Sequence, residues 1–151
     1  MEDWRRIDID ALDPENNLTL EDLIPEVEPV SQAELQQRVT NLRTLMSKGA
    51  SKDAISLITE QPPYGADAEG KEQYLNTVID VLTSTKQTEI TQIVESLSLE
   101  QQNVLFKFLY KGMASQKGQQ QGGVLLAWFE KSVEITGLGP VVRYLSDRRT
   151  V

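Results

Sequence analysis

SLEQQNVLFKFLYKGM, residues 98–113, is the most apolar unbroken stretch of the sequence. On a helical wheel, its large apolar side chains cover nearly the whole circumference: Leu99, Val104, Leu105, Phe106, Phe108, Leu109 and Tyr110. A helix that is apolar on all sides is normally enclosed by other elements. Ser98, followed three residues later by Gln101, is typical of a capping box at a helix start. The stretch therefore predicts a central, buried helix around which the rest of the chain packs.

Two lysines interrupt this apolar surface. Lys107 and Lys111 are four residues apart, so on a helix they lie one turn apart on a single stripe. An ammonium group removed from water needs an opposite charge or hydrogen-bond acceptors around it. We therefore expect the lysine stripe to reach solvent or a partner's carboxylate.

The segments on either side of this stretch also have helical spacing of apolar residues, with start and stop signals between them. Including the central stretch, seven helices are predicted, within residues 31–49, 51–62, 67–82, 90–97, 98–113, 124–137 and 139–145. Ser31 with Glu34 predicts a second capping box, Ser51 a further cap, and Gly139-Pro140 a helix start. Residues 115–123 are rich in Gln and Gly and indicate a flexible loop or a frayed helix start. The fold class is therefore all-α, an orthogonal bundle or a short α-solenoid.

The net charge of −8 belongs entirely to the first thirty residues. Residues 1–30 carry ten acidic side chains and two arginines, which leaves thirteen acids and thirteen bases for residues 31–151. Three prolines and little helical periodicity accompany these acids. We therefore divide the chain into an extended acidic tail, residues 1–30, and a helical body, residues 31–151.

The tail nevertheless contains apolar residues that suggest a contact. Trp4 precedes Ile7 and Ile9, which alternate with acids at the period of a strand. One interpretation is an extended peptide that docks this face on another protein while Arg5 and Arg6 meet carboxylates. The alternative is a solvated tail whose Trp4 folds back on its own core. A second cluster could dock weakly in the same way: Leu18, Leu20, Leu23 and Ile24.

The chain lacks the residues that most catalytic and metal-binding functions need. The chain has no cysteine and no histidine, which removes thiolate sites and the commonest general base and metal ligand. The spacing of Asp8, Asp10 and Asp13 does not fit a calcium loop, and no phosphate-binding loop is present. Neither half has the basic surplus of a nucleic-acid binder, and no stretch is apolar for the length of a membrane span. We expect no catalysis, no cofactor, no metal and no small-molecule substrate, in a cytoplasmic protein.

Two further groups of residues stand out near the end of the chain. Trp128 and Phe129 are adjacent, so on a helix they point about 100° apart and one of them should be core. Arg143, Arg148 and Arg149 form a modest basic patch, with Lys131 nearby in sequence. The patch is either a solvated last turn, favoured by the helix dipole, or a binding surface.

Four blocks of sequence, taken in order, resemble a known family. They are WRRIDID at residues 4–10, LYKGM at 109–113, VLLAWFEK at 124–131 and GLGPVVRYLSDRRTV at 137–151. Together they are similar to the smallest subunit, the p16 family, of the actin-related protein 2/3 complex. The resemblance extends from Trp4 to Val151, and its last block is the most specific.

This resemblance implies a non-catalytic structural and adaptor subunit of a seven-subunit assembly that nucleates branched actin filaments. The helical body would dock on the propeller subunit, near a scaffold subunit, with Arg143, Tyr144, Arg148 and Arg149 among its contacts. The tail would tether an actin-related protein through its first apolar and basic residues: Trp4, Arg5, Arg6, Ile7 and Ile9. The expected location is the cytoplasm, in actin-rich structures of the cytoskeleton. The alternative is a free-standing helical protein-binding module whose acidic tail covers its own groove.

Overall fold

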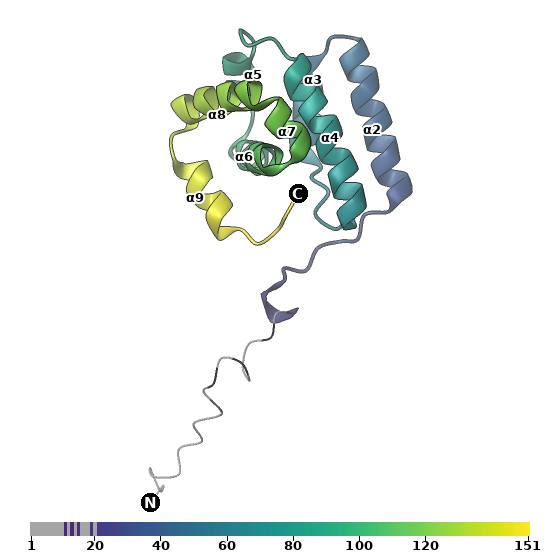
Figure 1. Ribbon diagram of the computed structural model, residues 1–151, viewed down its shortest axis with the longest axis vertical. Helices are drawn as coiled ribbons and strands as arrows, with labels where there is room; N and C mark the ends of the chain where they lie inside the picture. The colour runs from purple at the N-terminus through teal and green to yellow at the C-terminus, as the bar shows by residue number, and fades with distance from the viewer. Residues whose placement is uncertain (1–10, 12, 14, 16–18, 20) are drawn as a thin grey trace, which may run out of the picture.

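The computed structural model describes residues 11, 13, 15, 19 and 21–151 of the chain. Within residues 21–151 it has one short 3-10 helix, eight α-helices and no strand (Figure 1). The elements are η2 Glu21–Leu23, α2 Gln32–Ser47, α3 Ser51–Glu60, α4 Ala68–Ser84, α5 Ile90–Ser96, α6 Leu99–Ala114, α7 Gln116–Gln120, α8 Gly122–Thr136 and α9 Gly139–Ser146. The predicted all-α class is confirmed for this part of the chain, and the choice between bundle and solenoid stays a prediction.

Helix α6 is the predicted central helix, and the structure confirms its position. It contacts α3, α4, α7, α8 and α9, and in Figure 1 it lies in the middle of the body. Its buried residues are Val104, Leu105, Phe106, Lys107, Phe108, Leu109 and Gly112. The predicted capping box is also present, since the Ser98 N–H donates to Gln101 Oε1 at 2.8 Å and the Gln101 N–H donates to Ser98 Oγ at 3.3 Å. Leu99 differs from the expectation because, in the first turn, its side chain is 58% exposed.

Helix α7 was not among the seven predicted helices and lies in the segment whose composition indicated a flexible loop or a frayed helix start. Ser115 begins this helix, with Oγ accepting a hydrogen bond from the Gly118 N–H at 3.0 Å. A Cβ atom at Gly118 would lie 1.9 Å from the carbonyl oxygen of Gly112 on α6. The two helices can approach this closely only without a side chain, so the glycine that indicated flexibility permits close packing instead.

Two of the predicted helix starts differ from expectation. The Ser31 Oγ accepts from the Glu34 N–H at 3.3 Å, but the Glu34 carboxylate forms an ion pair with Arg38 and does not return to the cap. Ser51 is the first residue of α3, which has no side-chain cap. The prediction that Ser51 caps the helix is therefore wrong, because the preceding turn places Ala50 at the N-cap position. That turn contains Gly49, whose positive φ of 70° directly after the C-cap Lys48 ends α2.

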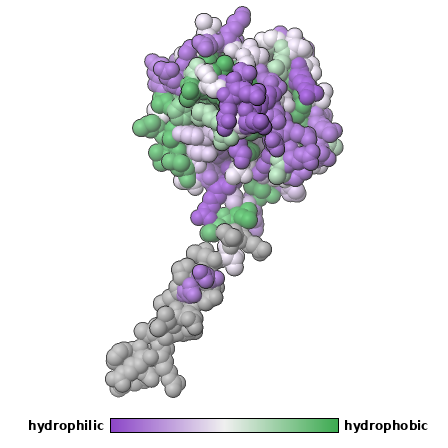
Figure 2. All heavy atoms as spheres, viewed as in Figure 1, coloured by the Kyte–Doolittle hydropathy of each residue, from purple (hydrophilic) through white to green (hydrophobic). Residues whose placement is uncertain are grey.

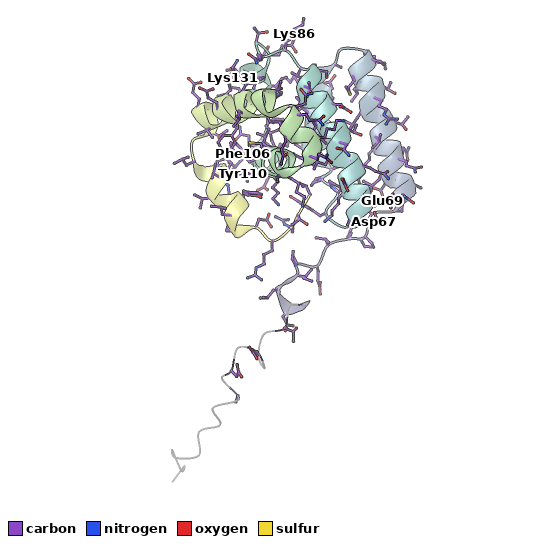
Figure 3. All side chains as sticks on the ribbon, viewed as in Figure 1. Asp67, Glu69, Lys86, Phe106, Tyr110 and Lys131 are labelled. Carbon is purple, nitrogen blue, oxygen red and sulfur yellow. The ribbon has the colours of Figure 1, made fainter. Side chains whose placement is uncertain are left out.

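The structure decides which residue of the Trp128-Phe129 pair is core. Trp128 is fully buried, and its Nε1–H donates to the carbonyl oxygen of Leu82 at 3.0 Å. Phe129 is half-buried and packs edge-on against Phe106 and Tyr110 of α6. Figure 3 labels these two α6 residues at the centre of the body. Helix α8 is therefore fixed on the core by the indole and directs the neighbouring phenyl ring toward α6.

Candidate partner-binding surface

A stacked pair of tyrosine rings joins helix α9 to α6. Pro140 stands at the helix start, as its sequence predicted. Further along, Tyr144 stacks on Tyr110 with ring centroids 4.3 Å apart and an interplanar angle of 4°. Tyr110 in turn meets the edge of Phe129 at 5.4 Å. This row of rings joins α6, α8 and α9, so Tyr144, predicted as a partner contact, has a packing role within the body.

The chain beyond α9 returns to α6 and supplies hydrogen-bond acceptors for the Lys107 ammonium group. The Lys107 Nζ donates to Asp147 Oδ2 at 2.6 Å, to Tyr64 Oη at 2.8 Å and to the Arg149 carbonyl oxygen at 3.2 Å. These three acceptors match the three protons of the ammonium group. The Lys107 side chain is only 5% exposed, and the carboxylate that it meets belongs to the same chain and not to a partner. Lys111, one turn later, is exposed.

The exposed Arg149 also binds Asp147, the carboxylate that pairs with Lys107. Its Nε and Nη2 donate to the two carboxylate oxygens of Asp147 at 3.1 and 2.9 Å, a bidentate arrangement. Its guanidinium carbon lies 5.2 Å from the centre of the Tyr64 ring. Hydrogen bonds from Arg149, and then those from Lys107, hold the pKa of Asp147 well below its usual range, and the same carboxylate raises the pKa of Arg149. The network formed by Tyr64, Lys107, Asp147 and Arg149 will be called the Lys107 network.

The four body residues predicted to bind a partner do not all meet at one place. Arg143, Tyr144 and Arg149 line a hollow of about 400 Å³ between α6 and α9. Arg143 there donates from Nε to Asn103 Oδ1 at 2.8 Å. Arg148 instead donates from Nη1 to the carbonyl oxygen of Leu23, at 3.3 Å. Lys131 donates to the Gln87 carbonyl oxygen at 2.6 Å, so its ammonium group is held on the chain between α4 and α5.

An apolar stripe on the outside of α9 was not identified from the sequence. Leu138, Val142 and Leu145 are 67%, 62% and 76% exposed, and their spacing of four and three residues places them on one side of the helix. Figure 2 shows hydrophobic residues on the side of the body where α8 and α9 lie. The sequence signal was the helical spacing itself, which normally indicates a buried face. We call these three residues the α9 stripe.

The predicted tail contacts Trp4, Arg5, Arg6, Ile7 and Ile9 lie outside the residues that the structure describes. Leu18 and Leu20 of the second predicted cluster are also outside this set, whereas Leu23 is half-buried and Ile24 is exposed. Among the described residues, no group of acids could hold a metal ion. In the same part of the chain, no helix has both the length and the apolar character to cross a membrane.

Comparison with known proteins places the chain in a family. A family model described as "ARP2/3 complex 16 kDa subunit (p16-Arc)" matches residues 3–151. This chain belongs to the p16-Arc family. The resemblance found in the four sequence blocks is thereby confirmed.

Several relatives of the chain are similar to it over nearly the whole length of both proteins. Actin-related protein 2/3 complex subunit 5 of Saccharomyces cerevisiae is 52% identical over 151 residues, 99% of this chain and 98% of the relative. The human subunit 5-like protein is 32% identical over 149 residues, 98% and 94% of the two chains. Subunit 5-C of Xenopus laevis is 28% identical over the same shares. These names describe subunits of a complex.

Proposed function

We propose that this chain is a structural and adaptor subunit of an actin-related protein 2/3 complex, which nucleates branched actin filaments. The observation that carries the proposal is 52% identity to the yeast subunit 5 over essentially the full length of both chains. The role is non-catalytic, and the place of action is the cytoplasm, in actin-rich structures of the cytoskeleton. The arrangement of α6 among five contacting helices supports an orthogonal bundle as the form of the body.

The body docks on the propeller subunit through the α9 stripe. Three large apolar side chains that face solvent on one helix form a small patch suited to burial against another protein. Arg143, Arg148 and Arg149 follow or interrupt the stripe and are all exposed. The chemistry that fits is an apolar patch bordered by carboxylates, and that is the surface we assign to the partner.

The tail acts as a tether for an actin-related protein. Trp4, Ile7 and Ile9 supply an apolar contact area, and Arg5 and Arg6 supply charge for acidic groups on the partner. A tethered partner binds at a high effective concentration and can still change orientation. The acidic linker between these contacts and the body repels itself and favours extended conformations.

Reconstitution tests this function directly. Because the native chain has no cysteine, a Glu95→Cys variant can be biotinylated at one site on α5, at the opposite end of the body from η2 in Figure 1. The full chain is mixed with the remaining subunits of the yeast complex and captured on streptavidin. The proposal predicts recovery of both actin-related proteins and the propeller subunit at one copy each per biotinylated chain.

Recovery of the chain alone would contradict the assignment and favour the free-standing binding module. The dependence of capture on ionic strength further separates the assembly role from the free-standing binding module. An acidic tail held on its own body by charge should loosen as ionic strength rises, whereas an apolar subunit contact should persist. Capture is therefore repeated at low and high salt with the same chain.

A further inference from the structure

The last residues of the acidic tail lie against the helical body. The Val30 N–H donates to the Gly65 carbonyl oxygen at 3.2 Å. At the other end of the segment, Arg148 Nη1 donates to the Leu23 carbonyl oxygen at 3.3 Å. Figure 1 shows this stretch running from η2 to the start of α2, below the body. Two points separated by seven residues are therefore bonded to residues far away in the sequence.

Gly65 shows how close this approach is. A Cβ atom at this position would lie 1.8 Å from the Glu28 carbonyl oxygen and 3.0 Å from Pro29 Cα. The positive-φ glycines in the described residues are Gly49 and Gly137, so Gly65 is not needed for a left-handed turn. Its missing side chain instead leaves the space in which the backbone of residues 28 and 29 lies.

The body residues at both bonded points are themselves fixed by the Lys107 network. Tyr64, next to Gly65, accepts a hydrogen bond from Lys107 and has its N–H bonded to the Pro62 carbonyl oxygen at 2.9 Å. Arg148 stands between Asp147 and Arg149, which are both bonded to Lys107. One buried lysine thus positions the two sides of the surface on which the segment lies.

We propose that the body carries a docking site for residues 23–30 of its own chain, formed by Gly65 and Arg148. The tether then begins near Asp22 and not at Ser31. From Asp10 to Leu23 the chain can span at most roughly 45 Å, against roughly 65 Å if it were free up to Val30. The site therefore shortens the reach of the tether and sets the point from which it leaves the body. This consequence rests on the tether role proposed above.

Distance measurements between two spin labels test the docking site on the full chain. Because there is no native cysteine, labels can be placed on Glu26→Cys in the segment and Asp53→Cys on α3, both exposed positions. Docking predicts a narrow distance distribution. In a Gly65→Ala chain the new methyl group must displace the segment, and the distribution should widen by on the order of 10 Å, the span of about five flexible residues.

Two further variants make the result specific. Arg148→Gln removes the second bond and should also widen the distribution, by less than Gly65→Ala. Gly123→Ala is the matched control, since nothing lies within 4 Å of a Cβ atom there, and it should leave the distribution narrow. Circular dichroism confirms that each variant is folded. If Gly65→Ala loses its helical signal, the distance distribution in Arg148→Gln tests the docking site instead.

A broad distribution in the parent chain would overturn the docking site, and so would an unchanged distribution in a folded Gly65→Ala chain. If Gly65→Ala does not fold, an unchanged distribution in Arg148→Gln has the same meaning. These measurements need no other subunit. A failure of docking is therefore distinguishable from a failure of assembly, which is read in the reconstitution.

Discussion

Helices α6 and α9 illustrate two different ways in which this chain uses an apolar sequence. Helix α6 is enclosed by five other helices, and its large side chains from Val104 to Leu109 are buried. Helix α9 makes its main contact with α6 alone and exposes the α9 stripe. Burial of apolar area stabilises the fold in the first helix, and the same kind of surface remains available for binding in the second.

The two helices also differ in the forces that hold them. The contacts of α6 are mostly apolar, with the buried Lys107 as the exception. The segment around α9 depends on one stacked tyrosine pair and on the Lys107 network. We therefore expect core substitutions to change stability most, and substitutions on the outside of α9 to change assembly with little effect on stability.

The largest effect is expected in the core. Phe108 is fully buried and lies 6.0 Å from the Tyr74 ring, centroid to centroid. Phe108→Ala removes a buried ring and leaves a cavity, which should lower the free energy of unfolding by about 4 kcal/mol. Urea denaturation followed by circular dichroism measures this change. Leu99→Ala on the same helix is the control, because that exposed side chain should cost less than about 0.5 kcal/mol.

The next effect concerns the Lys107 network. Asp147→Ala leaves the buried Lys107 ammonium without its carboxylate and should lower the free energy of unfolding by about 3 kcal/mol. Asp80→Ala removes the acid of an exposed pair with Lys117, and should cost less than about 1 kcal/mol. Equal losses of unfolding free energy in Asp147→Ala and Asp80→Ala would show that the Lys107 network contributes no more than an exposed ion pair.

The pH dependence of stability follows from the same carboxylate. The pKa of Asp147 is lower in the folded chain than in the unfolded chain because Arg149 and Lys107 bind its charged form. Its contribution is therefore complete above the unfolded pKa of about 4 and is lost as the pH falls below that value. Thermal unfolding between pH 6 and pH 3 should show a smaller acid-induced loss in Asp147→Asn than in the parent. Parallel profiles would contradict this assignment.

A smaller effect is expected from the tyrosine stack. A double-mutant cycle with Tyr110→Leu and Tyr144→Leu should give a coupling energy of about 1 kcal/mol, since stacked rings gain this much beyond their buried area. Urea denaturation of the two single variants and the double variant provides the values. If the losses in unfolding free energy of the two single variants add up to that of the double variant, other contacts hold α9 on α6.

The sequence predicted the centre of the fold better than its edge. Residues 98–113 could be identified as the core because their apolar side chains surround the helix axis, and this signal is local. The same holds for Gly49 and Gly139-Pro140, which mark helix ends. The choice between Trp128 and Phe129 required the position of Leu82, 46 residues earlier, whose carbonyl oxygen accepts from the indole.

The candidate surface was only partly predictable for a similar reason. Lys107 and Asp147 are 40 residues apart, and no spacing rule connects them. Gly118 indicated a loop, although its lack of a side chain permits the contact with Gly112. The exposed side of α9 has the pattern of a buried helix face. An apolar stripe has the same residue spacing in the sequence whether it packs inside the chain or against another protein.

The most direct test of this account compares assembly and stability in one variant of α9. In Val142→Asp/Leu145→Asp, two exposed side chains of the α9 stripe become charged. The prediction is a free energy of unfolding within about 0.5 kcal/mol of the parent, together with loss of the propeller subunit in the streptavidin capture. Full recovery of that subunit by a folded variant would contradict the division between an enclosed core at α6 and a binding surface at α9.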